Sequence, residues 1–176
     1  VRNSGNLDSM RADLLREKAG LESDTDAHLR EHSLEIQLPF LARRRPSISI
    51  VPVCLGQLGY KEVEKIGRGV AQAIREYGQP VLLVASTDMS HHIPAAEAER
   101  LDGKAIEQME LFDPRGLHDT VRKNRISMCG VLPTTAVLCA ARELGAQGVK
   151  LVRYSHSGHV TGDHREVVGY AGLVIG

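Results

Sequence analysis

The sequence has few of the features that mark secreted, membrane-bound or nucleic-acid-binding proteins. It contains three cysteines, an odd number without paired spacing, so no disulfide framework is expected and a cytoplasmic location is predicted. No apolar run approaches the length of a membrane span. Its 22 basic residues balance its 22 acidic residues, so no overall field attracts nucleic acid or an anionic membrane. We therefore predict neither a nucleic-acid partner nor a membrane partner.

Nucleotide-binding loops are also absent, because neither G-x-x-x-x-G-K nor G-x-G-x-x-G occurs in the chain. The 176 residues do contain short apolar runs that alternate with segments of helical periodicity. This pattern, and a length sufficient for one core, predict a single α/β domain over residues 1–176. We predict a mixed, mainly parallel sheet flanked by helices, with the last two strands as an antiparallel pair. Helices are expected at 9–18, 29–41 (limited by Pro39), 60–77, 95–111, 113–121 and 131–144, and strands at 47–55, 81–86, 149–154 and 167–175.

The most informative segment is VLLVASTDMSHH, residues 81–92. Its valine-rich start predicts a buried strand, and ligands in open α/β sheets bind beyond the carboxyl ends of strands. Asp88, His91 and His92 follow that strand, which favours a reactive site. The alternative is a polar loop in which Asp88 caps a helix and the histidines face solvent.

Cys129 differs from the other two cysteines because it lies just before an apolar helix. Unpaired N–H groups at a helix N-terminus favour a thiolate, which is a soft ligand for iron, copper or zinc. A buried structural cysteine, or a nucleophile of Cys-His-Asp type, explains the residue equally. Cys54 and Cys139 are expected to be small buried apolar residues.

Two further segments carry histidines. His28 and His32 are four residues apart, but the chain lacks the HEXXH pattern of zinc proteases, and Glu35 extends an acidic stripe there. For His32, a structural hydrogen-bonding role competes with a catalytic one. The glycine-spaced loop with His156, His159 and His164 either lines a pocket or is an ordinary surface loop.

Four motifs together resemble the Memo family, most closely its prokaryotic branch, the AmmeMemoRadiSam system protein B. They are EHSLEIQLPFL (31–41), STDMSHH (86–92), MCG (128–130) and YSHSGHVTGDHREVVGYAGLVI (154–175), and they occur in the family's order over almost the whole chain. The resemblance implies a fold similar to the class III extradiol ring-cleaving dioxygenases, which use non-haem iron.

The same resemblance implies site residues. Cys129 matches the family's metal-binding cysteine, and His91 with Asp88 matches its later histidine and the aspartate before it. We expect Cys129 to bind a divalent metal, iron first and copper or zinc as alternatives. His91 would bind the metal or act as an acid/base, and Asp88 would orient it. His32, Glu35 and His156 are weaker candidates for the same pocket.

This chain departs from the family in lacking the early histidine motifs of the kinds PHAGY and SHH. We therefore expect residues 1–176 to be the C-terminal portion of a Memo-like domain without its first strands, beginning abruptly at Val1. Two metal ligands would then be absent, leaving the site incomplete. An N-terminal segment outside this chain is the expected partner for the exposed sheet.

Three functions remain open at this point. The first is a metal-dependent oxidoreductase similar to a non-haem iron dioxygenase. The second is a non-catalytic module that binds a peptide or a small acidic ligand in the same pocket, a use associated with animal members of the family. The third is a metal-free cysteine hydrolase that uses Cys129.

Overall fold

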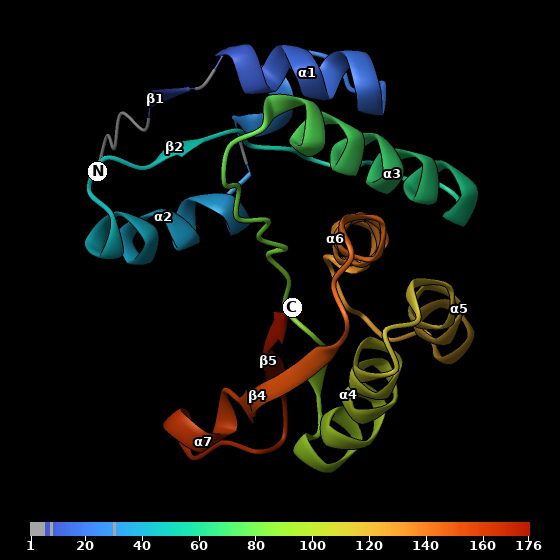
Figure 1. The fold of residues 1–176 in the computed structure, drawn as a ribbon. Coiled ribbons are helices and arrows are strands. Elements are labelled where there is room, and N and C mark those ends of the chain that lie inside the picture. Colours follow the sequence, from blue (N-terminus) through green and yellow to red (C-terminus); the bar gives the residue numbers. More distant parts are fainter. Residues whose placement is uncertain (1–5, 8, 30) are drawn as a thin grey trace.

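The computed structural model describes residues 6–7, 9–29 and 31–176. Val1, at which we expected the domain to begin, lies outside the described residues. The elements are β1 (Asn6–Leu7), α1 (Ser9–Ala19), the short 3-10 turn η1 (Asp26–His28), α2 (Ser33–Arg44), β2 (Ser49–Ile50), α3 (Tyr60–Tyr77), β3 (His91–Ile93), α4 (Ala95–Glu110), α5 (Pro114–Asn124), α6 (Val131–Leu144), β4 (Val149–His156), α7 (Gly158–Thr161) and β5 (Val167–Ile175). The structure is a mixed α/β arrangement (Figure 1).

The strands form two small sheets. β3, β5 and β4 form a three-stranded antiparallel sheet with β5 in the middle, and β1 and β2 form a two-stranded parallel pair. The predicted antiparallel pairing of the last two strands is confirmed. The prediction of a mainly parallel sheet is wrong, because a parallel return needs a long crossover. β4 and β5 are instead joined by the four-residue α7 and a short loop.

Residues 81–86 do not form the buried strand predicted from their valine-rich sequence. They pair with no strand in the described part of the chain, and Val81, Leu82 and Val84 are exposed. Pairing with β5 begins only where Met89 N–H donates to the Gly169 carbonyl, 2.9 Å away. An apolar run forms a strand only when a neighbouring strand hydrogen-bonds to its backbone. No strand among the described residues does so for residues 81–86.

Two other elements near the N-terminus also differ from expectation. Within the predicted strand 47–55, only Ser49–Ile50 pairs. α2 continues through Pro39 to Arg44, although proline removes one helical hydrogen bond. Because Glu35 and Pro39 are both exposed, water can bond the Glu35 carbonyl that the proline leaves unpaired.

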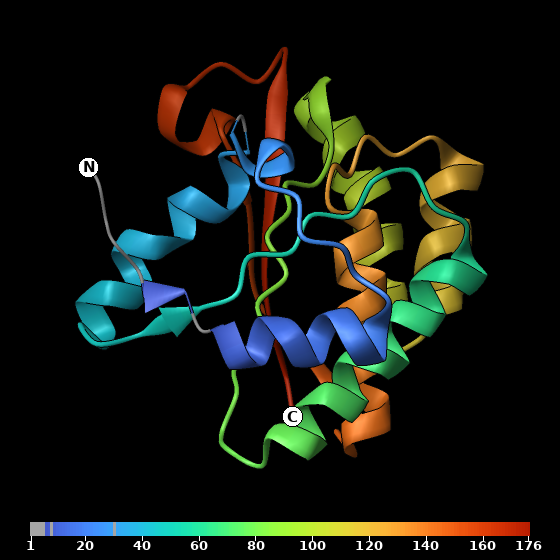
Figure 2. The same cartoon turned by 90° about the horizontal axis from the view of Figure 1, so that it is seen from above.

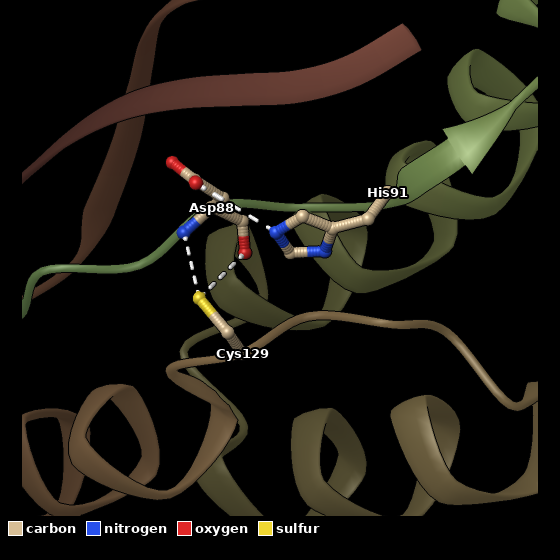
Figure 3. A group of neighbouring side chains, drawn as sticks. All are labelled: Asp88, His91 and Cys129. Carbon is tan, nitrogen blue, oxygen red and sulfur yellow. Dashed lines mark hydrogen bonds and ion pairs between the residues drawn. The ribbon is translucent and has the colours of Figure 1, made fainter. Parts of the chain in front are cut away.

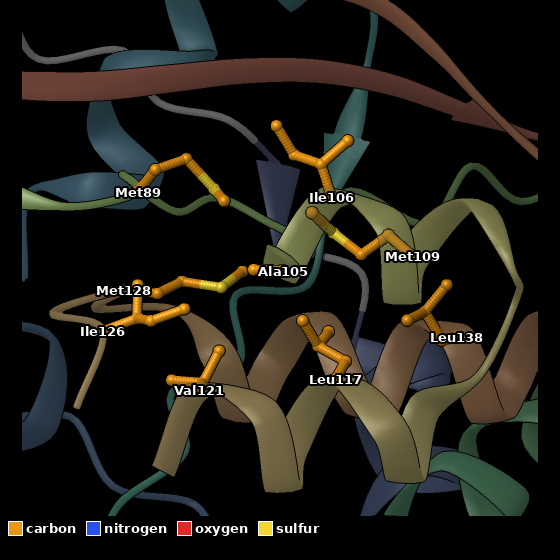
Figure 4. Close-up of a cluster of buried hydrophobic side chains, with 9 residues drawn as sticks. All are labelled: Met89, Ala105, Ile106, Met109, Leu117, Val121, Ile126, Met128 and Leu138. Carbon is orange, nitrogen blue, oxygen red and sulfur yellow. The ribbon is translucent and has the colours of Figure 1, made fainter. Parts of the chain in front are cut away.

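The longer helices pack in two groups. α4 lies against β4 and β5 and also contacts α5, while α3 packs between α1 and α6 (Figures 1 and 2). The core lies between α4, α5, α6 and the β4–β5 hairpin (Figure 4). Its fully buried members are Met89, Ala105, Ile106, Met109, Leu117, Val121, Ile126, Met128 and Leu138.

Among the described residues, no helix combines the length and apolar character needed to cross a membrane. The proposed likeness to extradiol dioxygenases stays a prediction, since the small antiparallel sheet by itself does not establish it.

Candidate metal centre

Asp88, His91 and Cys129 come from two segments that the hydrophobic core holds side by side. Asp88 lies three residues before β3, His91 is the first residue of that strand, and Cys129 lies in the turn before α6. Each segment is anchored by a buried methionine next to a site residue, Met89 beside Asp88 and Met128 beside Cys129. The sequence predicted that the site residues follow the carboxyl end of a strand. In the structure they lie instead around the start of β3.

Figure 3 shows the His91 ring directed at the Asp88 carboxylate and the Cys129 sulfur directed at the Asp88 backbone. One potential ligand atom from each lies within 4.8 Å of the other two. Nε2 of His91 is 3.6 Å from Oδ2 of Asp88, and the Asp88 backbone N–H donates to Sγ of Cys129 at 3.2 Å. A carboxylate, an imidazole and a thiol thus lie close together, the grouping that the resemblance to the Memo family implies.

The orientation of His91 is fixed by the backbone of Ser127. Nδ1 of His91 lies 2.7 Å from the Ser127 carbonyl oxygen, and the His91 backbone N–H donates to Ser127 Oγ at 2.8 Å. A carbonyl only accepts, so Nδ1 carries the proton in the neutral ring. Nε2 then presents its lone pair toward Asp88 and is the nitrogen free to bind a metal.

Thr87 and Gly130 hold the two segments together. The Gly130 N–H donates to Thr87 Oγ1 at 2.8 Å, and Thr87 Oγ1 donates to the Asp88 carbonyl at 2.8 Å. A β-carbon on Gly130 would lie 2.5 Å from Cβ of Thr87, so only glycine allows this approach. Thr87 lies inside the STDMSHH motif and Ser127 directly precedes the MCG motif, but neither was among the predicted site residues. Their position in the sequence was the only available signal.

The weaker candidates do not join this cluster in the described structure. His32 and Glu35 are exposed near the start of α2, and the His32 side chain makes no capping hydrogen bond there. α2 reaches the region instead through Gln37, whose side chain donates to Ser86 Oγ at 3.0 Å. His156 belongs to a separate group with Glu99 and His159. The prediction that His156 serves the same pocket is therefore not supported by its position.

The three cysteines are all free, but their surroundings differ. Burial raises the pKa of the Cys139 thiol to about 11, and burial also raises the pKa of Cys54. Cys129 is exposed. Because the thiolate is the reactive form, Cys139 stays an inert thiol near neutral pH.

We expect iodoacetamide at pH 7.5 to alkylate Cys129 first and to leave Cys139 unmodified until the protein unfolds. Peptide mass spectrometry over a time course measures the three rates, and a sample in denaturant gives the unprotected rates. Equal, slow labelling of all three cysteines in the folded protein would contradict this expectation and would dismiss a cysteine hydrolase.

Comparisons with known proteins identify the family. A family model described as Memo-like protein matches residues 6–174. A MEMO1 family protein of Methanopyrus kandleri is 37% identical over 170 residues, which cover 96% of this chain and 60% of that relative. A MEMO1 family protein of Methanothermobacter thermautotrophicus is 39% identical over 160 residues, covering 91% of this chain and 58% of the relative.

The chain therefore spans about three fifths of the length of these relatives. The family match extends over nearly every described element, from β1 to β5. It includes all three residues of the candidate metal centre. The resemblance carried by the four sequence motifs is thereby confirmed, and the chain belongs to the Memo-like protein family.

Proposed function

We propose that Asp88, His91 and Cys129 contribute ligands to a transition-metal centre, and that the protein is a metal-dependent oxidoreductase of the non-haem iron dioxygenase type. The observation that carries this proposal is the convergence of the three side chains within 4.8 Å. The Asp88 carboxylate and the Nε2 lone pair of His91 both face inward, and two such groups 3.6 Å apart are stabilised by a cation between them.

The mixture of donors favours a transition metal, and iron is our proposal for it. Thiolate and imidazole ligands suit iron, copper and zinc, whereas the hard cations magnesium and calcium are held by oxygen ligands. Bound iron would supply one-electron and oxygen chemistry to a substrate at this position. Copper and zinc are the alternatives that the same donors allow.

The surrounding residues would prepare the site for a metal. The Ser127 carbonyl selects the His91 tautomer whose Nε2 is free, and the Asp88 N–H supplies a donor to the Cys129 sulfur. If the metal takes its ligands elsewhere, the same Nε2 can receive a proton from a substrate, with Asp88 orienting the ring. The Asp88 side chain is about half exposed, so a substrate can reach the cluster.

Three protein donors leave room for further ligands and for a substrate. We propose that the additional ligands come from a segment that the longer relatives have outside the matched region. The oxidoreductase activity is proposed for the complete protein, and a cytoplasmic location is part of the same proposal.

Replacing Cys129 by serine is expected to weaken iron(II) binding at least about tenfold, because the soft thiolate is lost while the shape is kept. His91→Asn should have a similar effect, because it removes the inward nitrogen. Affinity is measured anaerobically by isothermal titration, and metal content by mass spectrometry, on a protein that includes the segment proposed to supply the additional ligands. The control is His92→Asn, since His92 is exposed and its positive φ of 54° suits asparagine.

The proposal fails if Cys129→Ser and His91→Asn bind iron(II) as the unmodified protein does. It also fails if His92→Asn loses as much affinity as the two site variants, because the effect would then not come from the cluster. Far-UV circular dichroism of each variant establishes that the fold is retained.

The openness of the cluster favours a second candidate function, a non-catalytic module that binds a peptide or a small acidic ligand. Cys129 is exposed and Asp88 is about half exposed, so a ligand can approach without any movement of the chain. Loss of ligand binding in His91→Ala, combined with no oxygen uptake by the iron-loaded protein on phenolic substrates, would favour this function over the oxidoreductase.

A further inference from the structure

A second group of metal-binding side chains lies at the far end of the β4–β5 hairpin. Glu99 comes from α4, His156 ends β4, and His159 lies in α7. One potential ligand atom of each lies within 4.8 Å of the other two. The group shares no residue with the Asp88 cluster, and β5 lies between the strands that carry His91 and His156.

The buried imidazole of His156 is the unusual feature of this group. The residue is only 2% exposed, yet its Nδ1 has no hydrogen-bond partner. Its Nε2 has only the Glu99 carboxylate, at 3.5 Å, which is long for a hydrogen bond. Buried polar atoms are nearly always paired, and a bound ligand would account for a buried ring without one normal hydrogen bond.

His159 is held face to face with this ring. The ring centroids of His156 and His159 are 3.8 Å apart and their planes differ by 23°. Nδ1 of His159 lies 3.0 Å from Ser155 Oγ, and it accepts from the His156 backbone N–H at 3.4 Å. Metal binding through Nε2 places the ring proton on Nδ1, where Ser155 Oγ can accept it. The contact orients the imidazole and leaves Nε2 of His159 without a competing partner among the described contacts.

The loop after α7 brings a fourth candidate ligand to the edge of the group. The ring of His164 stands edge-on to that of His156, with centroids 5.4 Å apart. The neighbouring carboxylate is already engaged, because Arg165 Nη2 donates to Asp163 Oδ2 at 2.7 Å. Glu99 is therefore the carboxylate that faces the imidazoles.

We propose that Glu99, His156 and His159 form a second site, for a divalent transition metal such as Zn²⁺. Two imidazoles and one carboxylate are a donor set that zinc accepts, with a fourth position for water or His164. The bound ion would satisfy the buried His156 ring and would join α4 to β4 and α7. The site needs none of the residues of the proposed oxidoreductase centre.

The test uses the full chain with Cys129→Ala, so that the first cluster lacks its thiolate. Isothermal titration with Zn²⁺ alone measures the affinity of the second site, and Co²⁺ reports the ligand field through its visible absorption. We expect Zn²⁺ to bind this protein and to raise its melting temperature, because an ion that binds only the folded state stabilises it.

Glu99→Gln and His159→Gln should each weaken Zn²⁺ binding at least about tenfold and abolish the rise in melting temperature. Both residues are exposed, so the variants are expected to fold. His92→Asn in the same background is the matched control and should bind as before. Absence of Zn²⁺ binding in the Cys129→Ala protein, or unchanged affinity in both site variants, would overturn the proposal.

Discussion

Replacing Asp102 by alanine is expected to lower the free energy of unfolding by about 3 kcal/mol, because it removes the acceptor at the centre of a buried network. Asp102 lies on α4 and is 0% exposed. Its carboxylate accepts from the backbone N–H of Ser90 at 2.9 Å and from the Tyr154 hydroxyl at 2.8 Å. Without it, the Ser90 N–H is left buried and unpaired.

The same carboxylate joins three elements to one helix. Ser90 precedes β3, Tyr154 lies in β4, and a β-carbon at Gly169 in β5 would come within 2.0 Å of Asp102 Oδ2. All three strands of the antiparallel sheet therefore meet α4 at this one side chain. The Ser90 end of the network lies two residues from Asp88, so the variant should also weaken metal binding at the candidate centre.

Chemical denaturation followed by circular dichroism measures the loss. Tyr154→Phe is the matched control and should cost about 1 kcal/mol, because it removes one hydrogen bond and leaves the Ser90 N–H paired. Asp102→Asn should cost less than Asp102→Ala, since its amide oxygen can still accept from Ser90. Equal stability of the alanine variant and the unmodified protein would show that the network does not support the fold.

The network also makes the free energy of unfolding of the unmodified protein decrease at alkaline pH. Burial, and then the hydrogen bond to Asp102, raise the pKa of Tyr154 above its ordinary value near 10. Stability from this neutral hydroxyl is complete below pH 10 and is lost as the pH rises toward the higher folded pKa. In Asp102→Ala the hydrogen bond no longer raises the pKa of Tyr154, so the shift is smaller. The total loss of stability at alkaline pH should therefore be smaller in this variant.

Local sequence signals were sufficient for the elements whose folding depends on their own periodicity. The amphipathic spacing predicted α3 with both ends correct, and β5 was predicted with its observed bounds. The helix expected at 113–121 is present as α5, and the side chain of its N-cap Asp113 accepts from the Arg115 N–H at 3.1 Å. Each of these features is decided by residues within a few positions of one another.

Features that depend on distant partners could not be predicted in the same way. The apolar run 81–86 carries a strand composition, but strand formation depends on an adjacent edge that composition does not reveal. The Asp102 network was missed because a lone aspartate on an amphipathic helix predicts solvent exposure. Convergence of Asp88, His91 and Cys129 was anticipated only because the motifs resembled a family. Thr87 and Ser127 help to position them, but the motifs carry no sign of these hydrogen bonds, which form between distant segments.

Exchange of Gly67 for alanine should lower the free energy of unfolding by about 2 kcal/mol, although alanine is the better helix former. Gly67 is buried in the middle of α3, where α3 packs on α6. A β-carbon there would lie 2.6 Å from the Ala136 carbonyl oxygen and 2.6 Å from Cβ of Cys139. One of these atoms is backbone, so α6 must move away.

Gly103→Ala is the matched control, because it is the same substitution at a position where the new β-carbon touches no neighbouring helix. Gly103 lies in the middle of α4, is exposed, and a β-carbon there would meet nothing within 4 Å. Gly103→Ala should therefore raise the free energy of unfolding by about 0.5–1 kcal/mol through helix propensity alone. Thermal and denaturant unfolding of the two variants would then shift in opposite directions, and a gain in stability by both would contradict close packing of α3 on α6.

The Gly67 variant also tests how the fold supports the candidate centre. Cys129 lies two residues before the first residue of α6, so a displaced α6 carries the sulfur away from Asp88. Iron(II) affinity should fall in Gly67→Ala and stay unchanged in Gly103→Ala, measured by titration at a temperature where both are folded. If Gly67→Ala is destabilised yet binds iron(II) normally, the turn at Cys129 is positioned by Thr87 and Gly130 without help from the α3–α6 contact.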